Sequence, residues 1–285
     1  MAKKRRFKWS LIVFFSVFLF VIFFALLHFL LFPDISKLKK TNPPKTAFME
    51  HREKEAKAKG KKYRIRQSWV PLSKISPYLI KAVLIAEDDK FWKHEGFDYE
   101  AIQKAYEKDL KLGKFKFGGS TVSQQLARNL YLSPEKTLIR KTREAIITWK
   151  MERELSKKRI LEIYLNVIEW GEGIFGVEMA ARHYFGKSSS ELSPIEAARL
   201  ATILPNPRKY NPTGEQPYVI NRSNLVYNIM VRRGIVPPGY EEAIERSEPE
   251  STPSPHYGKV EPTPYVPFQR PAPSIPPPER TTPSF

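Results

Sequence analysis

A carboxylate stands where helical periodicity asks for an apolar residue in segment 78–88, YLIKAVLIAED. Ile80 and Val83 recur at helical spacing, and Glu87 follows them at i+7 and i+4, so it should point inward. Burial raises the pKa of a carboxyl group toward neutrality, as a general base or acid requires. Asp88, one position further on, is predicted to be more solvated. The simpler alternative for Glu87 is a buried hydrogen bond or ion pair that closes the helix.

A second group of polar residues follows two glycines in segment 118–129, GGSTVSQQLARN. Ser120 or Thr121 is available to cap a helix that starts there. On this helix the polar side chains form two columns at i,i+4 spacing, Gln124 with Arg128 and Gln125 with Asn129. Amide donors, a guanidinium and the N–H groups of a helix N-terminus suit anionic oxygens. An amphipathic surface helix with a glycine hinge accounts for the same pattern.

A third group, RKTRE, lies near the start of a long predicted helix. Its Arg140 and Lys141 precede Glu144 by four and three residues, so ordinary pairing along one helix face accounts for them, at roughly 0.3 kcal/mol per pair. A role in chemistry requires that they lie near Glu87 in the folded protein. The following segment, KRILEIYLN at 158–166, has a tight apolar face and is predicted to be a core helix.

Length and composition bound the domain that must position these residues. The 285 residues suffice for one sizeable domain with appendages, or for two small domains. The absence of cysteine excludes a disulfide scaffold, cysteine-ligated zinc and thiol catalysis. A net charge of +18 predicts an anionic partner, which is nucleic acid, an acidic membrane surface or a phosphorylated substrate. The N-terminus favours the membrane, and we expect no nucleic acid.

Residues 11–32 are predicted to form a transmembrane anchor. They carry no formal charge apart from a potential one on His28, and as a helix they are long enough to cross a hydrocarbon core of about 30 Å. A cleaved signal peptide is the alternative, but the apolar run is too long and no small-x-small site follows it. Basic residues at 3–8 favour a cytoplasmic N-terminus, which places the rest of the chain on the periplasmic or extracellular side. Lysines just beyond residue 32 dilute this charge asymmetry.

Composition divides the chain into five predicted parts. A basic cytoplasmic N-terminus (1–10) and the anchor (11–32) precede a lysine-rich juxtamembrane connector (33–67), which either follows anionic head groups or is solvated. Residues 68–246 are predicted to form the folded domain, which is mainly α because strand signals are sparse. The tail, 247–285, holds 12 of the 25 prolines and is predicted to be disordered or polyproline II, either inert or recruiting a partner.

Five segments in order resemble the motifs of the peptidoglycan glycosyltransferases of glycosyltransferase family 51. They are EDDKFWKHEGFD, GGSTVSQQLARNLYLS, RKTRE, KRILEIYLN and GIFGVEMAARHYFGK. The resemblance covers about 69–212 and is to the monofunctional, single-anchor form. It implies a mainly α, lysozyme-like domain of two lobes, the smaller touching the bilayer, behind one transmembrane helix. It also implies a bacterial enzyme of the cytoplasmic membrane that polymerises lipid II into β-1,4-linked glycan strands for the cell wall.

The resemblance implies a role for each matched residue. Glu87 matches the base that deprotonates the acceptor 4-hydroxyl, which then displaces undecaprenyl pyrophosphate with inversion at the sugar. Glu144 matches a second acid that positions cations or the leaving group. Substrate-binding positions would be Ser120, Gln124, Gln125, Arg128, Asn129, Lys136, Arg140 and Lys141. The family usually carries lysine where this chain has Arg128, so the charge is kept but the donor geometry changes.

The implied enzyme needs no cofactor, because the pyrophosphate-linked sugar is already activated. A divalent cation, Mg²⁺ or Mn²⁺, is compatible with the pyrophosphate, but the five histidines show no ligand spacing and we expect no tightly bound metal. The expected partners are lipid II, the growing glycan strand and cytoplasmic membrane lipids. Other proteins of cell-wall synthesis or division are further candidates.

Two further motifs in the chain are typical of other protein classes, dinucleotide-binding proteins and transpeptidases. Gly171, Gly173 and Gly176 spell the dinucleotide fingerprint G-x-G-x-x-G, which requires a preceding strand where the sequence predicts a helix. The segment SPEK at 133–136 spells S-x-x-K, but the other transpeptidase motifs do not follow. Neither motif changes the prediction of a monofunctional enzyme.

Two other functions remain open from the sequence. A lysozyme or lytic transglycosylase would use a similar glutamate as an acid to cleave glycan strands, but cleavage offers no pyrophosphate for the cationic segments to hold. A non-catalytic, membrane-anchored scaffold would bind cell-wall precursors or proteins through its basic face and its tail. The scaffold predicts that Glu87 is dispensable.

Overall fold

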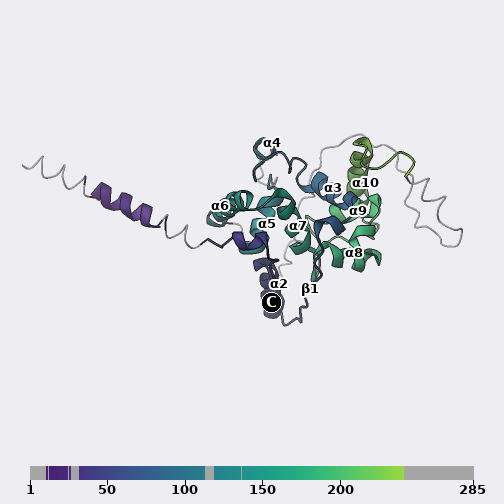
Figure 1. Cartoon of the computed structure of the whole chain (residues 1–285), viewed down its shortest axis with the longest axis horizontal. Helices are drawn as coiled ribbons and strands as arrows, with labels where there is room; N and C mark the ends of the chain where they lie inside the picture. The colour runs from purple at the N-terminus through teal and green to yellow at the C-terminus, as the bar shows by residue number, and fades with distance from the viewer. Residues whose placement is uncertain are drawn as a thin grey trace, which may run out of the picture. The chain divides into compact units, whose positions relative to one another are not determined.

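The computed structural model describes residues 11, 13–24, 26, 32–112, 119–135 and 137–240. This part of the chain is mainly helical, as predicted, with one small sheet (Figure 1). Its principal helices are α2 (Ala47–Ala58), α3 (Pro77–Glu87), α4 (Tyr99–Leu112), α5 (Val122–Tyr131), α6 (Leu138–Glu154), α7 (Lys157–Val167), α8 (Val177–Phe185), α9 (Pro194–Thr202) and α10 (Pro217–Arg232). Shorter elements are the 3-10 helices η1 (Ser36–Lys39), η2 (Leu72–Lys74) and η3 (Ser189–Glu191) and the strands β1 (Arg66–Gln67), β2 (Glu169–Gly171) and β3 (Ile174–Phe175).

Hydroxyl side chains start the helices that carry the polar segments. Thr121, Thr137 and Ser156 each accept a hydrogen bond from a first-turn N–H group, at the start of α5, α6 and α7 respectively. Such caps satisfy backbone donors that the helix itself leaves unpaired. Of the two predicted caps for the second polar segment, Thr121 is therefore the one that the structure uses.

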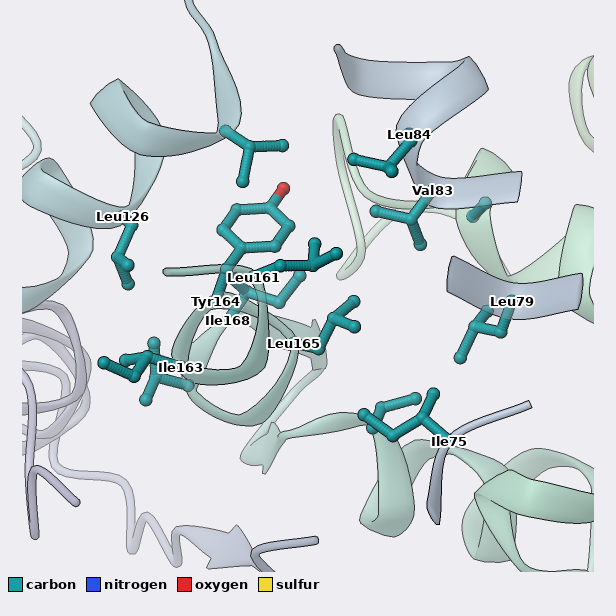
Figure 2. Close-up of a cluster of buried hydrophobic side chains, with 14 of the residues drawn as sticks. Ile75, Leu79, Val83, Leu84, Leu126, Leu161, Ile163, Tyr164, Leu165 and Ile168 are labelled. Atoms are coloured by element: carbon teal, nitrogen blue, oxygen red, sulfur yellow. The ribbon is translucent and has the colours of Figure 1, made fainter. Parts of the chain in front are cut away.

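Helix α7 lies at the centre of the hydrophobic core, which confirms the prediction of a core helix at 158–166. Figure 2 shows its Leu161 and Leu165 beside Val83 and Leu84 of α3, with Leu126 of α5 on the other side. Around it, α3 packs on α9 and α10, and α5 packs on α2, α6 and α7. The core thus fixes the ends of α3 and α5, where Glu87 and the second polar segment lie.

The sheet has the strand order β1-β3-β2, with β1 parallel and β2 antiparallel to β3. Gly171, Gly173 and Gly176 belong to the hairpin of β2 and β3 and to the start of α8, and helix α7 precedes the hairpin. A strand does lead into Gly171, but β2 has only three residues and forms an antiparallel hairpin with β3, which is not the parallel strand–helix–strand unit of a dinucleotide site. Gly176 has φ +79°, and a Cβ there would lie 2.7 Å from the Asn166 carbonyl oxygen, so glycine is needed for packing.

The segment predicted to be a juxtamembrane connector, 33–67, packs against the domain instead. Ile35 and Leu38 are buried in the core, and α2 lies against α5. The Arg159 guanidinium on α7 donates to the carbonyl oxygens of Leu38 at 2.8 Å and Thr41 at 2.9 Å. The prediction underestimated this segment because its few apolar residues are spaced to meet one surface, although nearly half of its residues are charged.

Part of the predicted organisation falls outside the described residues. Of the predicted anchor, residues 11, 13–24, 26 and 32 are described, and 13–24 are helical with exposed apolar side chains. Among the described residues, no helix combines the length and apolar character needed to cross a bilayer. The basic N-terminus (1–10), Lys136 and the proline-rich tail (247–285) lie outside the described part of the chain.

Candidate active site

Glu87 is the last residue of α3 and contacts the second polar segment directly. Nε2 of Gln125, on α5, donates a hydrogen bond to Oε2 of Glu87 at 2.8 Å. Oε1 of Gln125 in turn accepts from the hydroxyl of Tyr164, on α7, at 3.0 Å. Three helices therefore meet at the predicted base, and the carboxylate is held by a neutral amide.

The predicted direction of Glu87 needs a correction. The centre of the buried face of α3 is formed by Leu79, Ala82 and Val83, whereas Ile80 and Glu87 are only partly buried. Because Glu87 is in line with Ile80 on the helix, it continues the margin of the buried face. Glu87 therefore lies at the edge of the core, accessible to a substrate.

Asp88 was predicted to be solvated, and this prediction is wrong. Only 6% of its surface is exposed. The helix ends at Glu87, so the extended backbone of Asp88 (φ −161°, ψ 74°) no longer follows the helical phase. Its Oδ2 accepts from the N–H group of Val122, the first residue of α5, at 2.9 Å. The residue after the predicted base is thereby bonded to the start of the helix that carries Gln125.

His94 completes this connection. Its Nε2 lies 2.9 and 3.1 Å from the two carboxylate oxygens of Asp88, and its Nδ1 accepts from the N–H group of Gly96 at 3.1 Å. The bond from Gly96 requires a lone pair on Nδ1, so Nε2 carries the hydrogen that faces Asp88. The hydroxyl of Thr121 donates to the Gly96 carbonyl oxygen at 2.7 Å. The loop after α3 is thus tied at several points to the start of α5.

Gly96 in this loop has a backbone conformation and close neighbours that disfavour a side chain. It has φ +89°, and an added Cβ would lie 2.9 Å from Cγ of Glu152 and 3.0 Å from Cγ2 of Thr148. We expect Gly96→Ala to lower the free energy of unfolding by about 3 kcal/mol, through backbone strain and overpacking together. Chemical denaturation of the native and variant proteins measures the change.

Gly186→Ala is the matched control for this substitution. Gly186 also has a positive φ, +70°, but no atom lies within 4 Å of an added Cβ. Only the backbone strain applies there, so the expected loss is about 1 kcal/mol. Equal losses at the two glycines would show that the contacts with Glu152 and Thr148 are relieved at little cost.

The electrostatic surroundings of Tyr164 show which charges gather beside Glu87. Burial raises the pKa of the Tyr164 hydroxyl well above its ordinary value, and the negative charge of Glu87 adds to this rise. The positive charge of Arg128 acts in the opposite direction. Arg128 follows Gln125 by three residues on α5 and forms no ion pair with a carboxylate among the described residues. A carboxylate and an available guanidinium therefore share this part of the site.

The cations of the third segment also reach α5. Nζ of Lys141 donates to Oγ of Ser120, just before the N-terminus of α5, at 3.1 Å. Arg140 and Lys141 both bond to Glu144, whose side chain is fully buried. The predicted pairing on one helix face is confirmed. The bond to Ser120 additionally shows that the second and third segments meet in space, as a role in chemistry requires.

Glu144 and Arg140 differ in how completely their polar atoms are paired. Each carboxylate oxygen of Glu144 is bonded to a cation, so this residue orients Arg140 and Lys141. Nε of Arg140 is buried and has no hydrogen-bond partner among the described residues. An unpaired buried N–H group is costly, and an anionic oxygen would satisfy it.

Two of the predicted substrate-binding residues are occupied within α5 itself. Oε1 of Gln124 accepts from the N–H group of Thr121 at 3.0 Å, which completes a capping box with the Thr121 hydroxyl. Nδ2 of Asn129 donates to the Gln125 carbonyl oxygen at 2.8 Å. Through these bonds both residues stabilise the helix α5 itself. Their contact with substrate stays a prediction, as does that of Lys136.

Sequence reasoning missed three residues of this site, Asp88, His94 and Tyr164. Tyr164 sits in an apolar run, where an aromatic residue ordinarily indicates core packing. The Asp88–His94 contact spans a helix end and an irregular loop, where periodicity carries no information. All three residues lie within segments that resemble the family motifs, EDDKFWKHEGFD and KRILEIYLN, and this was the signal that could have found them.

The described residues contain no group of three or more histidines and carboxylates placed to hold a metal ion. What the site offers is a carboxylate at the margin of the core, close to one guanidinium, and a nearby pair of cations fixed by a buried acid. The carboxylate can accept a proton from a hydroxyl nucleophile. The cations can stabilise a leaving group that departs as an anion.

Comparisons with known proteins agree with this chemistry. The family model described as transglycosylase matches residues 53–231. A biosynthetic peptidoglycan transglycosylase of Nitrosospira multiformis is 46% identical over 231 residues, which cover 81% of this chain and 98% of that protein. Proteins with the same name from Dechloromonas aromatica and Aromatoleum aromaticum are 55% and 56% identical, over 60% and 59% of this chain and 74% of each relative.

Proposed function

This chain belongs to the transglycosylase family and is a peptidoglycan glycosyltransferase of cell-wall synthesis, and we propose that it polymerises lipid II with Glu87 as its base. In the proposed reaction Glu87 removes the proton from the 4-hydroxyl of the acceptor sugar. The oxygen attacks the anomeric carbon of the donor, inverts it and displaces undecaprenyl pyrophosphate. The product is a β-1,4-linked glycan strand.

The observation that carries the proposal is that residues on or directly before α5 bond both the predicted base and a cation of the third segment. Gln125 on this helix bonds the carboxylate of Glu87, and Ser120 just before it bonds Lys141. A base for the nucleophile and cations for the leaving group are both required when a weak hydroxyl displaces a diphosphate. Helix α5 positions both sets of residues.

We assign the diphosphate of the donor to Ser120, Arg128, Arg140 and Lys141. Nε of Arg140 supports this assignment, because it is a buried donor without a partner among the described residues. Glu144 would hold Arg140 and Lys141 in place and would not touch the substrate. Gln124 and Asn129 would shape α5, and Lys136 would add a further cation.

We also propose that the protein acts at the cytoplasmic membrane, where the lipid-linked substrate resides. Residues 11–32 would span the bilayer with the N-terminus in the cytoplasm, and the lysozyme-like, two-lobed domain would act on the outer side. Helix α4 supports a contact with lipid, since Tyr99, Ile102, Tyr106 and Leu110 are exposed at i, i+3, i+7 and i+11. Such an apolar stripe suits a bilayer surface.

No cofactor enters the proposed reaction, and a divalent cation is an optional partner of the diphosphate. Mg²⁺ or Mn²⁺ would bind through the oxygens of the diphosphate. Other cell-wall synthesis or division proteins are proposed partners of the parts outside the domain.

Incubation of the full-length protein in detergent with radiolabelled lipid II tests the function. We expect a polymer that gel electrophoresis resolves and that a muramidase digests, with no clearing of isolated peptidoglycan. Clearing of peptidoglycan would indicate the hydrolytic alternative. Binding of lipid II without polymer would indicate the scaffold.

A further inference from the structure

We propose that Tyr164 is a positioning residue for the polymerisation reaction: its hydroxyl fixes the amide of Gln125, which keeps the Glu87 carboxylate ionised and correctly oriented. The inference rests on the proposed role of Glu87 as the base. It adds a residue of the core helix α7 to the machinery of proton transfer.

The geometry is a chain of two hydrogen bonds across three helices. The Tyr164 hydroxyl donates to Oε1 of Gln125 at 3.0 Å, and Nε2 of Gln125 donates to Oε2 of Glu87 at 2.8 Å. Figure 2 shows the Tyr164 ring rising from α7 between Leu126 and Leu84, with its oxygen at the end turned away from α7. The hydroxyl thus reaches the boundary between the core and the site.

The order of donors and acceptors in this chain is fixed. An ionised carboxylate only accepts hydrogen bonds, so Gln125 must turn its NH₂ group toward Glu87. The amide oxygen then faces Tyr164, whose hydroxyl is the group that can donate to it. With the hydroxyl present, the reversed amide would lose its bond to the carboxylate. By donating to the amide oxygen, the Tyr164 hydroxyl stabilises the amide orientation that favours the charged form of Glu87.

Burial prevents water from replacing Tyr164 in this role. The residue is 1% exposed, and the largest cause of the raised pKa of its hydroxyl is that burial. The hydroxyl therefore remains protonated and remains a donor throughout the pH range in which the enzyme can be assayed. In a buried setting a lost donor leaves its acceptor unpaired, at a greater cost than on the surface.

Several charged groups face this chain of bonds from neighbouring elements. Asp88 and Arg128 act on Tyr164 from the end of α3 and from α5. Arg222 of α10 donates to the Ala86 carbonyl oxygen at 3.5 Å, and Arg233, directly after α10, forms an ion pair with Asp89. All of them stay in place when the Tyr164 hydroxyl is removed, so their effects cancel in a comparison of the native protein with Tyr164→Phe.

The test is the pH dependence of lipid II polymerisation by full-length Tyr164→Phe. The acidic limb of kcat/KM reports protonation of the essential base. Without the Tyr164 hydroxyl the amide is free to reverse, and we expect this limb to move to higher pH by about 0.5 to 1 unit, as loss of a bond to the ionised form predicts. At neutral pH we expect kcat to fall about tenfold while KM changes little.

Tyr184→Phe is the matched control. The Tyr184 hydroxyl donates to the Trp170 carbonyl oxygen at 3.0 Å, away from Glu87. Both variants lose one hydroxyl from a largely buried ring and keep its packing, so both should show similar small losses in thermal stability. Only Tyr164→Phe should move the acidic limb.

A double-mutant cycle establishes whether Tyr164 acts through Gln125. Gln125→Met removes the amide, so adding Tyr164→Phe to it should leave the pH profile and kcat unchanged. Additive effects, or a Tyr164→Phe enzyme with reduced kcat and an unmoved acidic limb, would overturn the proposal. Full activity of Glu87→Gln would instead refute the assignment of the base, which distinguishes the two failures.

Discussion

Replacement of Glu87 by glutamine is expected to lower kcat for lipid II polymerisation by about a thousandfold, the contribution of a positioned general base. Glutamine has nearly the same shape and can still bond to Gln125, but it cannot accept the proton of the acceptor hydroxyl. Lipid II binding should persist, because the cations near Ser120 are untouched. Single-turnover kinetics with radiolabelled lipid II, together with thermal unfolding, measure both quantities.

The control for this substitution is Glu50→Gln. Glu50 is an exposed carboxylate in the first turn of α2 and is not among the residues assigned to the site. It should retain native kcat, since only a solvated charge is lost. Polymer formation by Glu87→Gln at the native rate would remove this residue from the mechanism and favour the non-catalytic scaffold.

The second large effect is expected at Lys141. Its ammonium group bonds both Ser120 and Glu144, so Lys141→Met should remove a cation from the proposed diphosphate site and leave Glu144 with Arg140 alone. We expect kcat to fall about a hundredfold, as for the loss of one preorganised donor to a developing anion. A larger fall in kcat than rise in KM would show that the charge acts mainly on the leaving group.

Two further variants show whether the effect comes from the charge of Lys141 and its position. Lys141→Arg keeps the charge but changes the donor geometry, so its rate should lie between those of the native protein and Lys141→Met. Lys54→Met removes an exposed lysine from α2 and should leave kcat unchanged. If Lys141→Met and Lys54→Met behave alike, the diphosphate does not bind at Lys141.

Periodicity predicted the elements of this protein better than the directions of its charged side chains. Helices at Glu87, Gln125 and Glu144 follow from patterns of period 3.6 and from capping residues, and the structure confirms each of them. The orientation of Asp88 could not be predicted, because the helix ends one residue earlier and the phase is lost. The bond between Lys141 and Ser120 joins residues 21 positions apart and depends on packing that no local pattern describes.

The packing of segment 33–67 shows a second limit of sequence reasoning. Its mean polarity predicts a solvated connector, yet Ile35, Leu38 and Met49 are buried. A few apolar residues suffice when they fall on one surface, and the Arg159 guanidinium adds backbone contacts that composition cannot reveal. Average composition thus misjudged a segment in which a minority of residues determines the fold.

The N-terminus of α5 is bonded to Asp88, and its next turn is bonded to Glu87. A rigid-body tilt of this short helix would therefore misalign nucleophile activation and leaving-group departure simultaneously. An inhibitor that wedges against α5 would stop catalysis without resembling either sugar. Resistance would then require repacking beneath the helix, since exchanging individual cations would not restore the alignment.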